Sequence, residues 1–184
     1  TLLSKRLKEL EWHGILKRVA SSSGTRKTEY VLTQAGTELF DVINAVGTWG
    51  KRWIDMRHHL DSAEENLLIW DIRRNLRIES FPMHEAVLQI YIKDVPKKTS
   101  NWWFVFDGKQ RPDVGYLDPS LDVDLYIETS LSSLTKIWLG ESTPSIEQET
   151  GFFELDGSQK LIETFESWFG SSNFAAIPKL AFAS

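Results

Sequence analysis

The sequence contains no cysteine among its 184 residues. This absence excludes disulfide bridges, thiolate metal sites and cysteine nucleophiles, and it fits a protein of the reducing cytoplasm. Long apolar runs are lacking too, since no stretch approaches the roughly 20 residues that cross a bilayer, and the residues present show no signal peptide. We therefore expect a cytoplasmic protein with no membrane partner.

Histidine is scarce, and the sequence shows no recognisable catalytic or metal-binding pattern. The four histidines stand at positions 13, 58, 59 and 84, without the spaced partners of a zinc or catalytic site. Asp122 and Asp124 could hold a hard cation only if further oxygen ligands converged on them, and strand alternation predicts instead that both face water. No phosphate-binding loop or nucleophile elbow occurs. We predict no metal, no cofactor and no enzyme activity.

Charge divides the chain into two parts. Residues 1–59 contain ten Lys and Arg against six Asp and Glu, a net +4, whereas residues 60–184 contain eleven against twenty, a net −9. A hydrophobic fraction of 41% and an aromatic fraction of 12% are typical of a globular protein. The length allows one large or two small domains. A basic front and an acidic back indicate two modules with different partners.

The front of the chain has the element order helix, hairpin, long helix. The first helix ends at Gly14, strands follow near 15–19 and 30–33 around a Ser/Gly-rich basic tip, and Thr33 is a plausible cap for a helix reaching about residue 57. On the first helix, three leucines (Leu3, Leu7 and Leu10) line one side. The opposite side presents Thr1, Lys5, Lys8 and Trp12.

This order is that of a winged helix from its recognition helix onward. The segment also resembles the HxlR-type bacterial transcription regulators, with a Ser-x-Arg-Leu-x-x-Leu helix, a wing ending in Glu-Tyr-x-Leu-Thr and a Gly at the start of the last helix. The matching residues are Ser4, Arg6, Leu7, Leu10, Gly14, Glu29, Tyr30, Leu32, Thr33 and Gly36. The resemblance implies a winged-helix DNA-binding domain over residues 1–57. It also implies a homodimer formed by the helix 34–57 and by N-terminal helices that we expect to be missing from this chain.

The basic residues of this domain are the candidates for contacts with double-stranded operator DNA. We predict that Thr1, Ser4, Lys5 and Lys8 face the major groove, with Arg6 on the flank. Arg26 and Lys27 are the candidates for wing contacts with phosphate. The alternative is that each of these residues is simply a solvated surface group.

The back of the chain is predicted to be α+β, with an antiparallel sheet. A linker and a connecting helix occupy residues 58–82, and the second domain occupies 83–184. Strands are predicted at 86–93, 102–107, 113–117, 122–128 and 152–157, and helices at 131–140, 144–149 and 158–170. Many of the aromatic residues fall in this part, and composition alone favours a solid core over a lined cavity.

The stretch "DVDLYIETSLSSLTKIWLGESTPSIEQETGFFELDGSQKLIETF" resembles the sterol carrier protein fold. Leu134, Gly140, Pro144, Gly151, Leu155 and Gly157 occupy the matching places. The resemblance implies an apolar tunnel between sheet and helices that holds a fatty-acyl or other lipophilic ligand. The residues that we assign to this tunnel are Trp102, Phe104, Phe106, Tyr116, Leu125, Trp138, Phe152 and Phe165.

Together these features predict a bacterial regulator that binds operator DNA as a dimer. A lipophilic ligand in the second domain would modulate DNA binding by favouring one arrangement of the domains. Two alternatives stay open. One is a lipid-binding or carrier protein whose winged helix serves as a dimerisation element. The other is a regulator whose second domain is a solid core.

Overall fold

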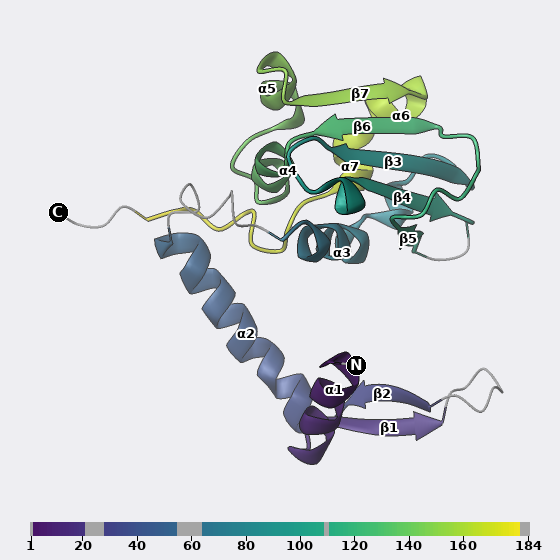
Figure 1. Cartoon of the computed structure of the whole chain (residues 1–184). Helices are drawn as coiled ribbons and strands as arrows, with labels where there is room; N and C mark the ends of the chain where they lie inside the picture. Colours follow the sequence, from purple (N-terminus) through teal and green to yellow (C-terminus); the bar gives the residue numbers. More distant parts are fainter. Residues whose placement is uncertain (1, 21–27, 55–63, 109–110, 181–184) are drawn as a thin grey trace. The chain divides into compact units, whose positions relative to one another are not determined.

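The computed structural model describes residues 2–20, 28–54, 64–108 and 111–180. The chain forms two compact units, coloured along the sequence in Figure 1. The first unit comprises Thr1–Trp53 and Lys179–Ser184, and the second comprises Ile54–Pro178. Within the described ranges, no helix is both long and apolar enough to cross a membrane.

The first unit has the predicted order of helix, hairpin and long helix. Its elements are α1 (Leu2–Trp12), β1 (Leu16–Ala20), β2 (Thr28–Leu32) and α2 (Gln34–Trp53). The two strands pair antiparallel, with Leu16 opposite Leu32 and Ala20 opposite Thr28. The helix α2 ends at Trp53, four residues before the predicted end, and residues 55–57 lie outside the described ranges.

A tight junction joins α1, β1 and α2. Gly14 adopts the left-handed conformation after α1, with φ of 73°, which a glycine reaches without steric cost. Thr33 is the N-cap of α2, as predicted: its hydroxyl accepts from the Gly36 amide at 3.2 Å. A Cβ on Gly36 would lie 2.2 Å from the Ile15 carbonyl oxygen, so only glycine lets α2 approach β1 this closely.

The apolar residues of the first unit are largely exposed. The helix α1 has no buried residue, and Leu2 and Leu3 are 71% and 68% exposed. Of the residues in α2, only Gly36 and Lys51 are buried. Elements that bury so little apolar area gain little from the hydrophobic effect, which is what normally stabilises a helix on its neighbours.

The second unit holds a five-stranded sheet and its covering helices. It begins with α3 (Glu65–Asn75), inside the segment predicted as linker and connecting helix. The elements that follow are η3 (Ile78–Ser80), β3 (Ala86–Ile92), η4 (Lys97–Thr99), β4 (Asn101–Phe106), β5 (Asp113–Gly115), β6 (Leu125–Thr129), α4 (Leu131–Trp138), α5 (Pro144–Glu149), β7 (Phe153–Gly157), α6 (Gln159–Glu163) and α7 (Phe165–Phe169). The α+β class is therefore confirmed.

The sheet is mixed, which corrects the prediction of an antiparallel sheet. The strand order is β5-β4-β3-β6-β7, and three of the four ladders are antiparallel. The central pair, β3 and β6, is parallel, with Leu88 opposite Leu125 and Ile92 opposite Thr129. The reason is topological: the chain leaves β5 at one edge and crosses to the other side of β3, so β6 runs in the same direction as β3. The alternation of apolar and polar residues predicts which face of a strand is buried. It does not predict whether the strand pairs parallel or antiparallel with its neighbour.

Side chains from one face of the sheet and from the helices form a single core. Its largest fully buried members are Trp102, Trp138, Trp168, Phe104, Phe153 and Phe169. The helix α3 contributes Leu68, Ile69 and Ile72 to the same core. In Figure 1, α6 and α7 lie on one side of the sheet. The opposite side carries exposed residues such as Tyr91, Tyr126 and Glu128, as expected for a sheet that is covered on one face.

Two local predictions differ from the structure. The helix predicted at 158–170 is two short helices, because the chain leaves helical geometry at Thr164, with φ of −102° and ψ of 9°. Asp124 was expected to face water, but it lies just before β6 and its Oδ2 accepts from the Val87 amide at 2.8 Å. Asp124 thus caps the sheet ladder at the start of the parallel pair.

Candidate functional site

The exposed face of α1 presents the basic residues of the first unit. Ser4, Lys5 and Lys8 are all exposed. Within the described part of the chain, neither Lys5 nor Lys8 forms an ion pair with a carboxylate. The three residues lie within a turn of one another along the helix, so their polar ends can reach one continuous surface. The two exposed cations of this surface, Lys5 and Lys8, suit a polyanion.

Two other cations of the first unit, Arg6 and Arg18, are held by carboxylates. The Arg6 Nη1 lies 2.7 Å from the Glu9 Oε2, one turn along α1. Arg18 on β1 donates to the Glu11 Oε1 at 2.8 Å and lies 6.0 Å from the centre of the Tyr30 ring. The hydrogen bond with Glu11 is the main cause that raises the pKa of Arg18. Arg18 is therefore tied to the junction of α1 and the hairpin, whereas Arg6 forms a surface pair that an anion can compete for.

Three of the predicted DNA contacts fall outside the described ranges. These are Thr1, Arg26 and Lys27. Their assignment stays a prediction, as does the assignment of Ser4, Lys5, Arg6 and Lys8 to DNA.

An apolar stripe runs along α2. We define the α2 stripe as Leu39, Val42, Ile43, Val46 and Trp49, which recur at three- and four-residue spacings. All five are exposed in the first unit, and Ile43 and Val46 reach 64%. An apolar helix face of this size is typical of a surface that a partner covers.

The eight predicted tunnel residues of the second unit differ in burial, and their assignment to a tunnel stays a prediction. Six of them are buried core members: Trp102, Phe104, Phe106, Leu125, Trp138 and Phe165. The other two, Tyr116 and Phe152, are exposed at 51% and 57%. The buried indoles are also anchored by hydrogen bonds, since the Trp138 Nε1 donates to the Asp71 Oδ2 at 2.8 Å and the Trp102 Nε1 to the Thr99 carbonyl at 2.9 Å.

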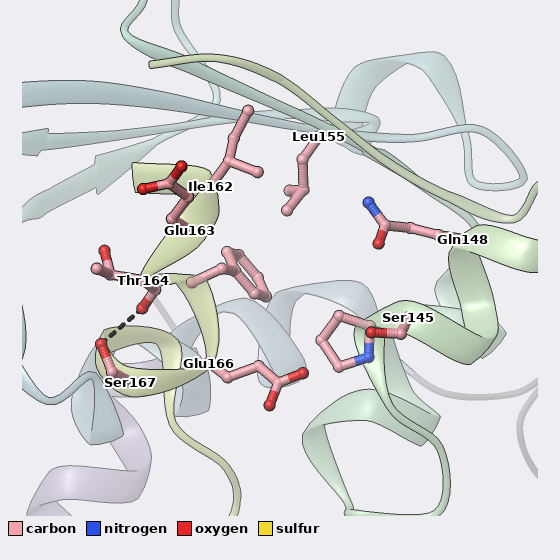
Figure 2. A pocket seen from close by; sticks show the side chains of 10 residues that line it. Ser145, Gln148, Leu155, Ile162, Glu163, Thr164, Glu166 and Ser167 are labelled. Atoms are coloured by element: carbon pink, nitrogen blue, oxygen red, sulfur yellow. Dashed lines mark hydrogen bonds between the residues drawn. The ribbon is translucent and has the colours of Figure 1, made fainter. Parts of the chain in front are cut away.

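A surface pocket of about 480 Å³ lies between α5, β7, α6 and α7 (Figure 2). The residues that line it are Pro144, Ser145, Gln148, Leu155, Ile162, Glu163, Thr164, Phe165, Glu166 and Ser167. Of the predicted tunnel residues, only Phe165 belongs to this lining. Sequence reasoning missed the pocket because its polar members come from separate short helices. The available signal was the pair of carboxylates that flank the apolar Phe165.

No group of three or more metal-ligating carboxylates and histidines occurs among the residues that the structure describes. His13 stacks edge-on against Trp12, with ring centres 4.7 Å apart. The other described histidine, His84, lies 3.9 Å from a Glu85 carboxylate oxygen at an exposed position.

Comparison with known protein families matches the front of the chain. Residues 1–58 match the HxlR-like helix-turn-helix family. The uncharacterized HTH-type transcriptional regulator YvaP of Bacillus subtilis (strain 168) is 39% identical over 54 residues, a match that covers 29% of this chain. The match spans only 50% of that relative's length.

Solved structures of low sequence identity cover more than half of this chain. Sterol carrier protein 2 from Yarrowia lipolytica, in its apo form, is 20% identical with a TM-score of 0.40, over 55% of this chain and 86% of that protein. The sec-alkyl sulfatase PisA1 of Pseudomonas sp., as a double mutant, is 16% identical with a TM-score of 0.46, over 63% of this chain and 18% of the sulfatase. Similarity at this level says nothing of ligand or catalysis. Residues 1–58 are therefore similar to the HxlR-like helix-turn-helix family.

Proposed function

We propose that the protein is a DNA-binding transcriptional regulator of HxlR type that acts in the cytoplasm as a homodimer. The observation that carries the proposal is the exposed basic face of α1 within a segment that matches the HxlR-like helix-turn-helix family. A helix with this face can enter the major groove, where side chains reach base edges and phosphates. Thr1, Ser4, Lys5, Arg6 and Lys8 are the proposed helix contacts, and Arg26 and Lys27 the proposed wing contacts.

The exposure of the α2 stripe supports the dimer. A second copy that packs its own stripe against Ile43 and Val46 would bury apolar side chains that are otherwise in water. The same symmetry would place two α1 helices on one duplex, as dimeric helix-turn-helix proteins do.

We further propose that the second unit binds a lipophilic small molecule and so modulates DNA binding. The surface pocket supports this, because it combines apolar and polar side chains in a concave site. A ligand that prefers one arrangement of the dimer shifts the population of the DNA-competent form by its difference in affinity.

The test is a salt titration of DNA affinity, measured by fluorescence anisotropy on duplexes enriched from a random library. The protein encoded by the gene is compared with the double variant Lys5→Ala/Lys8→Ala. A dimer that loses four phosphate contacts should have its slope of log K against log salt reduced by up to about 3.6, at roughly 0.9 per phosphate. The matched control is Lys97→Ala/Lys98→Ala, which removes the same charge from η4 in the second unit.

The titration also separates the proposal from a carrier protein whose winged helix only dimerises. A carrier would show no salt-sensitive DNA affinity. An equal change of the salt slope in the two double variants would show that Lys5 and Lys8 of α1 do not contact the DNA.

A further inference from the structure

The surface pocket of the second unit has an apolar floor. Leu155 of β7 and Ile162 of α6 are half-buried, and Phe165 of α7 is a buried core residue that also lines the pocket. In Figure 2, Leu155 and Ile162 both face the space between the helices. A volume of about 480 Å³ falls within the roughly 300–1,000 Å³ of small-molecule sites. The floor therefore suits the apolar body of a small ligand rather than a fully polar one.

The charges at this pocket have one sign. Among the ten lining residues, Glu163 and Glu166 are the charged ones, and none carries a positive charge. Glu163 is positioned by Gln159, whose Nε2 donates to its Oε1 at 2.9 Å. Glu166 is exposed and forms no ion pair with another described residue, and in Figure 2 its carboxylate extends toward Ser145.

Neutral polar groups complete the rim opposite Glu163. Gln148 and Ser145 of α5 are exposed and reach the pocket from the side across from α6. Their oxygens can accept hydrogen bonds from the N–H groups of a cationic head. An anionic ligand would find two carboxylates and no compensating cation among the lining residues, so its charge would be repelled there.

We propose that this pocket binds a lipophilic cation, whose apolar body packs on Leu155 and Ile162 and whose positive charge lies near Glu166. The inference names the ligand class for the ligand-responsive unit and in that sense rests on the proposed function, but the binding itself requires no DNA. In this proposal the ligand binds in the surface pocket and not among the aromatic residues of the core.

The experiment compares two probes of the same shape and opposite charge. Tetraphenylphosphonium and tetraphenylborate are titrated into the protein by isothermal calorimetry, without DNA. Tetraphenylphosphonium should bind with an affinity that falls as salt is added, because salt screens an exposed charge pair. Tetraphenylborate should bind at least tenfold more weakly.

Variants locate the binding. Glu166→Gln should weaken tetraphenylphosphonium binding roughly tenfold, and Glu163→Gln should weaken it less. The matched control is Glu154→Gln, which removes the same charge from the solvent-facing side of β7. Ser145→Trp, at an exposed lining position without a core contact to lose, should block the pocket for both probes.

Equal affinity for the two probes would overturn the proposal, as would an equal effect of Glu166→Gln and Glu154→Gln. Retention of full affinity in Ser145→Trp would place any bound cation elsewhere and would also overturn it. Because none of these readings involves DNA, a failed DNA titration leaves this result interpretable, and the reverse is equally true.

Discussion

At the scale of single residues, the start of β6 depends on close backbone contacts. Gly157 ends β7 with φ of 132°, and a Cβ there would lie 2.3 Å from the Asp124 carbonyl oxygen. The same carbonyl accepts from the Ser158 amide at 2.7 Å, while the Asp124 carboxylate accepts from Val87. One aspartate thus joins β3, β6 and the end of β7 through both its backbone and its side chain.

We predict that Gly157→Ala lowers the free energy of unfolding of the second unit by about 2–4 kcal/mol, because the methyl group clashes with backbone and the φ is strained. Gly115→Ala is the matched control. Its Cβ would meet nothing closer than 4.0 Å, and we expect a change within about 1 kcal/mol. Urea unfolding followed by tryptophan fluorescence measures both, and similar midpoints for the two variants would contradict the contact argument.

A second residue-scale prediction concerns the buried pair of Ser133 and Glu147. The Ser133 hydroxyl donates to the Glu147 carboxylate, and both residues are at least 95% buried. Ser133→Ala should destabilise the second unit by about 1–3 kcal/mol, because a buried acceptor loses its donor. Ser133→Ala with Glu147→Met should recover much of that loss, as measured by thermal unfolding. A double variant less stable than the single one would show that Glu147 acts through other contacts.

At the scale of elements, α2 combines a strong apolar pattern with little burial. Its stripe is as regular as that of a core helix, yet all five members are exposed. Propensity and capping explain why the helix forms, with Thr33 at its start and Lys51 and Arg52 in its last turn. They do not explain why an apolar face is presented to solvent, whereas the proposed second copy would cover it.

We predict that Val46→Glu weakens self-association at least tenfold, because a charge would be buried against apolar side chains of the second copy. The matched control is Thr48→Glu, which adds the same charge on the opposite side of α2 and should leave association unchanged. Sedimentation equilibrium of the gene-encoded protein measures both. If the two variants dissociate alike, α2 is not the interface.

Most elements of the fold could be predicted from period and turn signals. The alternation of apolar and polar residues identified the segments of β3 and β4. The parallel pairing of β6 was not predictable from alternation, since a parallel and an antiparallel partner bury the same face. The pocket was equally hidden, because Gln148, Leu155 and Glu166 meet only after α5, β7 and α7 have packed.

At the scale of the whole molecule, the two units differ in charge and in how well they bury their apolar residues. The basic first unit exposes both a cationic face and an apolar stripe, and the acidic second unit has a buried aromatic core and a pocket lined by two carboxylates. In our proposals the basic first unit binds DNA, a polyanion, and the acidic second unit binds a cation. Each unit then carries the charge opposite to that of its ligand.

The central claim is that the protein binds DNA as a dimer. The most direct measurement is native mass spectrometry of the gene-encoded protein, alone and with a duplex enriched from a random library. We predict a dimer alone, two chains on each duplex, and enriched half-sites spaced by one helical turn of about 10 base pairs or a multiple of it. A monomer in solution that binds one chain to a duplex without two-fold symmetry would contradict the account.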